Sequence, residues 1–166
     1  QLQGQGSRAT MLLHGAHVTE FVPEGGDPVL WMSKKSQFAD GLPVRGGIPI
    51  CWPWFGPHAS DSNLPVHGAA RLRAWEPVAS RLLEDGRVEV RLAFASGADA
   101  GDGVVADLRA ELTLRVGRAL EIELESINEG PAEVDIEEAL HAYFPLSNAE
   151  SAAVHGLEGA DYLDKL

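Results

Sequence analysis

The sequence predicts an all-β fold, in which antiparallel strands form a two-sheet sandwich. Apolar and polar residues alternate in several runs of the chain, which is the pattern of strands with one buried and one solvated face. Turn sequences rich in glycine and proline separate these runs. No stretch places apolar residues at helical spacing, so strands rather than helices are expected to build the core.

The alternation is clearest in three runs, which place apolar side chains at every second position and mostly polar side chains between them: 88–94, 108–116 and 120–124. Each run predicts a strand that buries one face. Two further runs, 9–22 and 70–78, alternate less regularly. We expect strands there as well.

Turn-forming residues gather at three places between these runs: 84–86, 97–103 and 128–131. The chain has 166 residues, of which 45% are hydrophobic. That length is sufficient for one core, and the sequence shows no internal repeat and no linker. We therefore expect residues 1–166 to form a single β-sandwich domain.

The charge balance argues against nucleic-acid binding. The chain carries 25 acidic and 13 basic residues, for a formal net charge of -12, and it has no run of lysine or arginine. A nucleic-acid-binding protein normally presents a basic patch. An acidic protein can still bind an anion through a few locally placed cations, so each arginine merits attention.

Three features of the sequence indicate where the protein is located: its cysteine content, the length of its apolar runs and its first residues. Cys51 is the single cysteine, so an internal disulfide is excluded and a reducing compartment is favoured. No apolar run has the length of a membrane span, and residues 1–7 do not resemble a secretory signal. These features predict a cytoplasmic protein without a membrane partner. Nothing in the pattern selects an oligomeric state.

The segment 41–71 differs from the rest of the chain. It lacks strand periodicity and concentrates glycine, proline, two tryptophans, two histidines and two arginines. A long irregular segment within a compact domain is often a functional loop. The alternative is a proline-rich excursion that caps one end of the sandwich.

The segment 133–144 contains the first candidate for chemistry. If it is a strand, the apolar residues share one parity except for Glu138, and His141 and Tyr143 point to the other side. An imidazole on such a face, near acidic neighbours, can exchange a proton with a ligand near neutral pH. The alternative is an ordinary half-exposed histidine.

Arg45 and Arg71 are the second pair of candidates. Arg45 precedes Gly46 and Gly47, which let a ligand approach the backbone closely. Arg71 ends the same irregular segment. A guanidinium group suits phosphate or paired hydroxyl groups. The alternative is that both arginines form structural salt bridges.

The aromatic residues and the remaining candidates are less specific. Trp52, Trp54 and Phe55 can form a wall for a sugar ring or can anchor the loop in the core. Cys51 is expected to be a small buried side chain. The histidines at 14, 17, 58 and 67 do not have the spacing of metal ligands, so no metal is expected.

Several blocks resemble the hexose-6-phosphate mutarotase branch of the aldose 1-epimerase family. They are Gly-Ala-His-Val at 15–18, Pro-Val-Leu-Trp-Met-Ser at 28–33, Val-Arg-Gly-Gly-Ile-Pro-Ile-Cys-Trp-Pro-Trp-Phe-Gly at 44–56, His-Gly-Ala-Ala-Arg at 67–71, Ala-Leu-His-Ala-Tyr-Phe at 139–144, Gly156-Leu157, Tyr162 and Asp164-Lys165. The resemblance runs in order from about Leu12 to the last residue.

The resemblance implies a galactose-mutarotase-like β-supersandwich that works without a cofactor. It implies that His141 is the catalytic acid, which protonates the ring oxygen of a hexose 6-phosphate and so opens the hemiacetal. Arg45 and Arg71 match arginines that are expected to contact the substrate at its phosphate. His67 matches a histidine at the sugar site of distant relatives. Asp164 corresponds to a turn residue rather than a catalytic one.

Members of this family continue well past the position that matches Leu166. The additional part normally supplies further strands, a substrate-binding aspartate and the catalytic glutamate. We therefore expect a sandwich that is incomplete on its C-terminal side and carries the acid but not the base. Glu137 and Glu138 lie close to His141 in sequence, but the family pattern assigns the base to neither.

Three functions remain open on the sequence. The first is an isomerase that interconverts the α and β anomers of a hexose 6-phosphate, in whole or as its N-terminal portion. The second is a non-catalytic carbohydrate-binding or regulatory β-sandwich. The third is a structural fragment whose exposed sheet edge promotes self-association.

Overall fold

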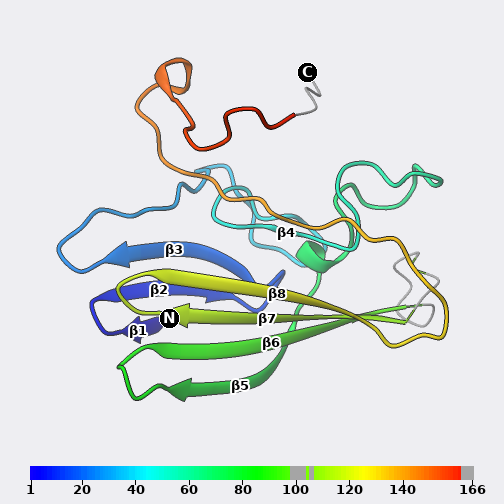
Figure 1. Ribbon diagram of the computed structural model, residues 1–166, viewed down its shortest axis with the longest axis horizontal. Helices are drawn as coiled ribbons and strands as arrows, with labels where there is room; N and C mark the ends of the chain where they lie inside the picture. Colours follow the sequence, from blue (N-terminus) through cyan, green and yellow to red (C-terminus); the bar gives the residue numbers. More distant parts are fainter. Residues whose placement is uncertain (98–103, 105–106, 162–166) are drawn as a thin grey trace.

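The protein folds as an antiparallel β-sandwich (Figure 1). The computed structural model describes residues 1–97, 104 and 107–161. Its strands are β1 Leu2–Gly4, β2 Ser7–Leu12, β3 His17–Pro23, β4 Ile50–Cys51, β5 Glu76–Leu82, β6 Val88–Ser96, β7 Leu108–Val116, β8 Leu120–Asn128 and β9 Ala139–Leu140. The helical elements of these residues are two short 3₁₀ turns, η1 Ala70–Leu72 and η3 Ala149–Ser151. The predicted all-β class is confirmed.

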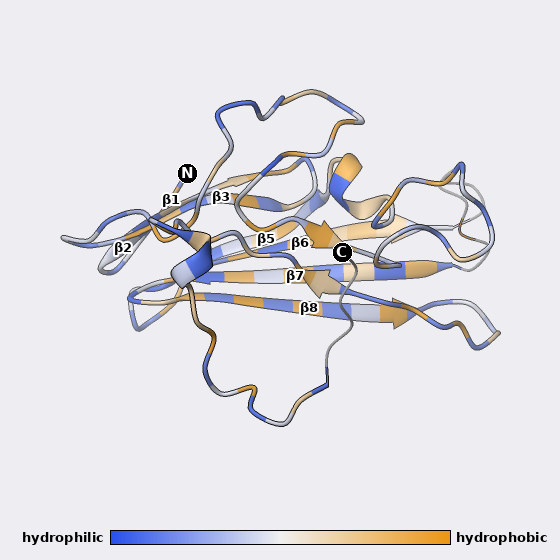
Figure 2. Ribbon diagram, turned by 90° about the horizontal axis from the view of Figure 1, so that it is seen from above, coloured by the Kyte–Doolittle hydropathy of each residue, from blue (hydrophilic) through white to orange (hydrophobic). Residues whose placement is uncertain are grey.

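The larger sheet has the order β5-β6-β7-β8, and the second sheet has the order β1-β2-β3. In the larger sheet the pairing of β6, β7 and β8 is unbroken, with Leu92 opposite Leu112 and Leu112 opposite Leu124. The register therefore places the alternating apolar residues of all three strands on one face. Their hydropathy alternates visibly along β7 and β8 in Figure 2. The strands predicted from the three regular runs are confirmed.

The opposite face of this sheet is covered by ion pairs. The buried Glu89 accepts hydrogen bonds from Arg81 at 2.8 Å and from Arg115 at 2.7 Å. These two guanidinium groups, Arg115 foremost, hold the pKa of Glu89 below its usual value. Arg91 pairs with Glu111 on the same face at 2.5 Å. The charged residues between the apolar positions thus satisfy one another.

The apolar core has two parts. One lies between the two sheets, where Val18 and Phe21 pack with Leu114 and Val116. The other covers the remaining half of the larger sheet with residues from the irregular segment and its end, above all Trp52 and Trp75. Both indoles pack against Phe94, with ring centroids 5.9 and 5.5 Å away. The irregular segment is therefore anchored to the sheet by its own aromatic residues.

Two predicted strands have different boundaries. Residues 9–22 form two strands, because the chain reverses at Gly15 and Ala16, both with positive φ. A Cβ on Gly15 would lie 2.9 Å from the carbonyl oxygen of Arg71, so a glycine is needed there. Residues 70–78 begin as the turn η1, held by the bond from Leu72 N to Ala69 O, and the strand starts only at Glu76.

The segment 133–144 is less regular than predicted. Only β9 is a strand, and it pairs with β4. Antiparallel backbone bonds continue on both sides, from Glu137 N to Pro53 O, from His141 N to Pro49 O and from Tyr143 N to Gly47 O, at 2.9 to 3.0 Å. In Figure 1 this part of the chain runs alongside the segment that contains β4.

The predicted buried face of this segment is not buried within the described chain. Val134, Ile136, Leu140 and Phe144 are 36–61% exposed, since no described segment packs over them. Glu138, the charged residue among these positions, accepts a hydrogen bond from Ser126 Oγ at 2.8 Å. That hydroxyl in turn accepts a bond from the buried Trp52 Nε1 at 2.9 Å.

This chain of bonds leads to a stability prediction. Replacing Trp52 by phenylalanine removes the donor to Ser126 and part of a fully buried indole. We expect the free energy of unfolding, measured by urea denaturation, to fall by about 1–3 kcal/mol. Trp31, which is 44% exposed, provides the control: its replacement by phenylalanine should change the free energy by less than about 0.5 kcal/mol. Equal losses of unfolding free energy in the Trp52 and Trp31 variants would contradict the prediction.

The predicted turn at 97–103 lies almost wholly outside the described residues, as do Tyr162, Asp164 and Lys165. The described part of the chain contains no helix long and apolar enough to cross a membrane.

Candidate functional site

The Arg45-Gly46-Gly47 turn lies at the centre of the candidate site. Both glycines have positive φ, 105° and 62°. A Cβ on Gly46 would lie 2.4 Å from Trp31 O, and one on Gly47 would lie 2.3 Å from Val18 O. The glycines are therefore required because the protein's own backbone approaches them.

The backbone of this turn is held from several directions. Gly47 N donates to Trp31 O at 2.8 Å, and Ser33 N donates to Arg45 O at 3.0 Å. Tyr143 N donates to Gly47 O at 2.9 Å, which ties the turn to the segment that contains His141. The side chain of Arg45 extends from this fixed backbone and is exposed.

Arg71 lies in η1 and is half-buried. Its Nη2 donates to Val66 O at 2.6 Å, whereas its Nε is buried without an acceptor among the described residues. Burial lowers the pKa of its guanidinium, and Arg45 and Tyr143 are close enough to contribute to the shift. The two predicted arginines are thus within electrostatic reach of each other.

Neither arginine pairs with a carboxylate within the described chain, whereas Arg81, Arg87 and Arg115 each do. The alternative expectation of structural salt bridges is therefore wrong for both among the described residues. Arg71 does have a structural bond, but its partner is a backbone carbonyl. Two guanidinium groups that pair with no carboxylate of the described residues, in a chain of net charge -12, form a local positive region that favours an anion.

His141 follows β9 and is half-buried among aromatic rings. Its imidazole stacks on Tyr143, with centroids 4.8 Å apart and planes inclined by 19°. The ring centroids of Phe55 and His67 lie 6.3 and 6.4 Å from that of His141. The imidazole therefore lies outside the apolar core.

Acidic partners of His141, expected from its sequence neighbours, are not found among the described residues. Glu137 accepts a hydrogen bond from Phe55 N at 3.0 Å, and Glu138 accepts the bond from Ser126 described above. The two carboxylates nearest in sequence hold the surrounding chain instead of pairing with the imidazole.

His67 has an unusual backbone conformation, with φ of 67°. Two bonds to Gly56 support it: His67 N donates to Gly56 O at 2.8 Å, and Gly56 N donates to His67 Nδ1 at 2.9 Å. Because Nδ1 accepts a hydrogen bond, the neutral ring carries its proton on Nε2. Nε2 is therefore the donor nitrogen of the neutral ring.

The aromatic candidates separate into two groups. Trp52 and Trp54 are buried, and Trp54 Nε1 donates to Pro65 O at 3.0 Å. They anchor the loop, as the alternative interpretation expected. Phe55 is half-buried, and its ring lies 4.7 Å from that of His67. The Phe55 ring lies against both imidazoles, whereas Trp52 contacts His67 through its backbone, where Trp52 N donates to His67 O at 3.3 Å.

The sequence assigned no role to His17, which the structure places directly beneath the turn. It is 1% exposed, and its Nε2 lies 2.7 Å from Gly46 O. Burial lowers the pKa of its imidazole to about 4, so the ring is neutral near pH 7. No periodicity or spacing could have indicated this contact, since the two residues are 29 positions apart.

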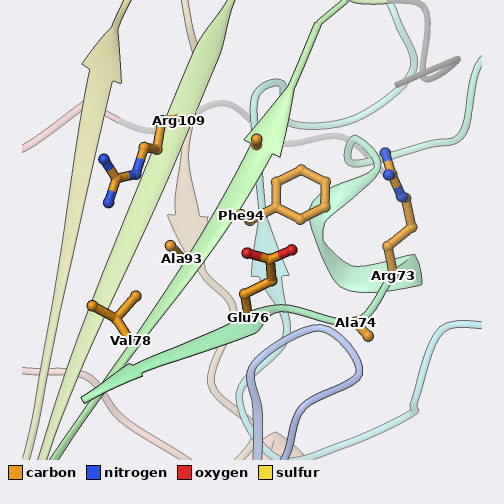
Figure 3. Close-up of a pocket in the computed structure, with 8 residues that line it drawn as sticks. Arg73, Ala74, Glu76, Val78, Ala93, Phe94 and Arg109 are labelled. Carbon is orange, nitrogen blue, oxygen red and sulfur yellow. The ribbon is translucent and has the colours of Figure 1, made fainter. Parts of the chain in front are cut away.

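Two hollows open beside segments described above, one at the aromatic part of the irregular segment and one against the larger sheet. One, of about 630 Å³, is lined by Phe55, Trp54, His58 and the acidic stretch 133–137, among others. The other, of about 320 Å³, lies against β5 and β6, where Arg73 and Arg109 flank Phe94 in the view of Figure 3. None of the four predicted site residues lines either hollow. Within the described chain, no group of three or more His, Cys, Asp or Glu side chains is arranged to hold a metal ion.

The sequence model of the aldose 1-epimerase family matches residues 1–166. The chain belongs to the aldose 1-epimerase family. An aldose 1-epimerase relative from Escherichia coli K12, named "putative glucose-6-phosphate 1-epimerase", is 35% identical over 159 residues, which cover 96% of this chain and 52% of the relative. A relative from Cenchrus ciliaris with the same name is 32% identical over 95% of this chain and 50% of its own length. The chain spans about half the length of these curated relatives.

Two solved structures share the fold of this chain. A "putative mutarotase (YeaD)" from Salmonella typhimurium superimposes with a TM-score of 0.69 at 36% identity, over 75% of this chain and 42% of that one. A galactose mutarotase related enzyme from Lactobacillus acidophilus shares the fold with a TM-score of 0.59 at 12% identity, over 78% of this chain and 43% of that one. The expected galactose-mutarotase-like sandwich is thereby confirmed.

Proposed function

We propose that this protein interconverts the α and β anomers of a hexose 6-phosphate. The observation that carries the proposal is that Arg45 and Arg71, which pair with no carboxylate among the described residues, are grouped beside the aromatic cluster of His67 and His141. Membership of the aldose 1-epimerase family, together with relatives named as glucose-6-phosphate 1-epimerases, supports it. The names of those relatives motivate the choice of a 6-phosphate.

The arginines are assigned to the phosphate. Arg45 presents an exposed guanidinium from a fixed turn, and Arg71 has an Nε–H without an acceptor among the described residues. A guanidinium group binds phosphate oxygens through charge-assisted hydrogen bonds. His67, which carries its proton on Nε2, is assigned as a donor to a sugar oxygen.

His141 is assigned as the acid. It donates a proton to the ring oxygen while a base removes the proton of the anomeric hydroxyl, so that the C1–O5 bond breaks and an aldehyde forms. Rotation about C1–C2 presents the other face of the aldehyde, and the reverse proton transfers close the ring with the opposite configuration. The carboxylates of Glu137 and Glu138 already hold Phe55 and Ser126, so the base is assigned to neither.

The phosphate assignment predicts a substrate-dependent defect. Replacing Arg45 or Arg71 by alanine should raise KM for glucose 6-phosphate by about 10–100-fold, because each change removes charge-assisted hydrogen bonds. Unphosphorylated glucose should be affected much less. The rate of anomer exchange is measured by magnetisation-transfer NMR at a series of sugar concentrations.

The experiment uses this chain and a chimera that adds the part of the E. coli relative which the chain does not match. We expect acceleration by the chimera and little or none by the chain alone, because the family resemblance implies that the catalytic glutamate belongs to the part that this chain does not match. Absence of acceleration in both forms, with the chimera folded, would refute the proposed activity. Equal KM changes for glucose and glucose 6-phosphate would refute the phosphate assignment.

A second candidate is a carbohydrate-binding module without catalytic activity. The engagement of Glu137 and Glu138 in structural bonds favours it for the described chain, since a mutarotase needs a base as well as an acid. Binding of glucose 6-phosphate by both forms, without faster anomer exchange in either, would establish this function instead.

A further inference from the structure

We infer that His17 is a positioning residue, whose hydrogen bond to Gly46 O fixes the direction in which Arg45 presents its guanidinium group. The inference rests on the proposed anion-binding role of Arg45.

The contact is direct and closely packed. His17 Nε2 lies 2.7 Å from Gly46 O, and the imidazole is 1% exposed. Because a carbonyl oxygen can only accept, Nε2 must carry the proton and donate it. A Cβ added to Gly47 would lie 2.8 Å from the same nitrogen, so imidazole and turn fit together without space for another atom.

The backbone bonds around the turn extend this effect to both sides of the site. Ser33 N donates to Arg45 O, and Arg45 N donates to Ser36 Oγ. Tyr143 N donates to Gly47 O, and the Tyr143 ring stacks on His141. His17 is thus the buried side chain that holds the glycine pair between Arg45 and the segment of the proposed acid.

The environment keeps this donor in one form. Burial lowers the pKa of His17 and outweighs the hydrogen bond to Gly46 O, which raises it, and the nearby guanidinium of Arg71 favours the neutral ring further. A neutral imidazole with its proton on Nε2 makes one directed bond to Gly46 O. A leucine of similar size would fill the space without a donor and leave that carbonyl oxygen without its partner.

Three variants of the full chain separate the hydrogen bond from the packing. His17→Gln places an amide nitrogen near the position of Nε2, His17→Asn places one near Nδ1, and His17→Leu supplies no donor. We expect His17→Leu and His17→Asn to weaken binding of glucose 6-phosphate by about tenfold, with His17→Gln recovering most of the loss. His155→Leu, the same change at an exposed position, should bind as the unmodified chain does.

A double-mutant cycle tests whether His17 acts through Arg45. Dissociation constants for glucose 6-phosphate are measured by NMR titration for Arg45→Ala, His17→Leu and the double variant. If His17 acts by directing Arg45, the double variant should bind no more weakly than Arg45→Ala alone. Independent effects that multiply would overturn the inference.

Amide hydrogen exchange tests the inference in the absence of any ligand. In His17→Leu, the amides of Gly47 and Tyr143 should exchange at least tenfold faster than in the unmodified chain, whereas the amide of Leu112 in β7 should not change. Unchanged exchange at Gly47 and Tyr143 would overturn the inference. If neither the unmodified chain nor the chimera binds glucose 6-phosphate, the proposed substrate is wrong, and the exchange measurement still decides whether His17 fixes the turn.

Discussion

Replacing His141 by alanine is expected to lower kcat for anomer exchange by about 10²–10⁴-fold, the usual contribution of a positioned general acid. The change removes the proton donor at the ring oxygen and leaves the proposed phosphate contacts in place. KM for glucose 6-phosphate should therefore change by less than about threefold. The measurement is magnetisation-transfer NMR on the chimera described above.

A control variant and a rescue experiment test whether the loss of rate is due to the missing imidazole of His141. His155→Ala removes an exposed imidazole and should leave kcat unchanged. Free imidazole added to His141→Ala should restore part of the rate, because the half-buried ring leaves a space that opens to solvent. A His141→Ala chimera that retains its full rate while correctly folded would exclude His141 as the acid.

The second large effect concerns stability and pH. The pKa of His17 is about 4 in the folded chain because the imidazole is buried, whereas an unperturbed histidine titrates near pH 6.5. Between these values the unfolded chain binds a proton that the folded chain does not. The contribution of His17 to stability is therefore complete above about pH 6.5 and is lost as the pH falls toward 4, by about 3 kcal/mol.

Urea denaturation of the full chain at pH values between 4 and 7 measures this loss. His17→Gln, which cannot titrate in this range, serves as the comparison. The difference in unfolding free energy between the two chains should shift by about 3 kcal/mol across the window. Carboxylates with a lowered pKa, such as Glu89, lose their contribution at the acidic end in both chains, so they cancel in the difference. If the unfolding free energies of the two chains change with pH in parallel, the expectation is contradicted.

Strand periodicity was sufficient for much of the larger sheet. The alternation at 88–94, 108–116 and 120–124 predicted three strands, and each exists with its apolar residues on the inner face. It predicted less well at 9–22 and 70–78, where a turn interrupts or precedes the strand. In those runs the local alternation continues through residues whose backbone reverses direction because of contacts with distant parts of the chain, such as Gly15 with Arg71.

In the candidate site, the sequence likewise identified residues but not the contacts that they make. Arg45, Arg71, His67 and His141 were selected from residue type, loop composition and family resemblance, and their roles remain predictions. The partners of these side chains could not be selected in this way. His17 and Gly46 are 29 positions apart, and Phe55 and Glu137 are 82 positions apart. Such contacts depend on how the irregular segment folds over the sheet, and no sequence period encodes that path.

The sequence by itself determined the fold class, three of the four strands of the larger sheet (β6, β7 and β8), the family and the residue types available for chemistry. These properties follow from local alternation and from motifs that are contiguous in the chain. Only the tertiary structure decided that two arginines lack carboxylate partners among the described residues, that Glu137 and Glu138 hold the backbone and a hydroxyl group, and that a buried imidazole supports the glycine turn. The physical reason is that burial and hydrogen bonding depend on which distant segments pack together, and long-range packing is fixed only in the folded chain.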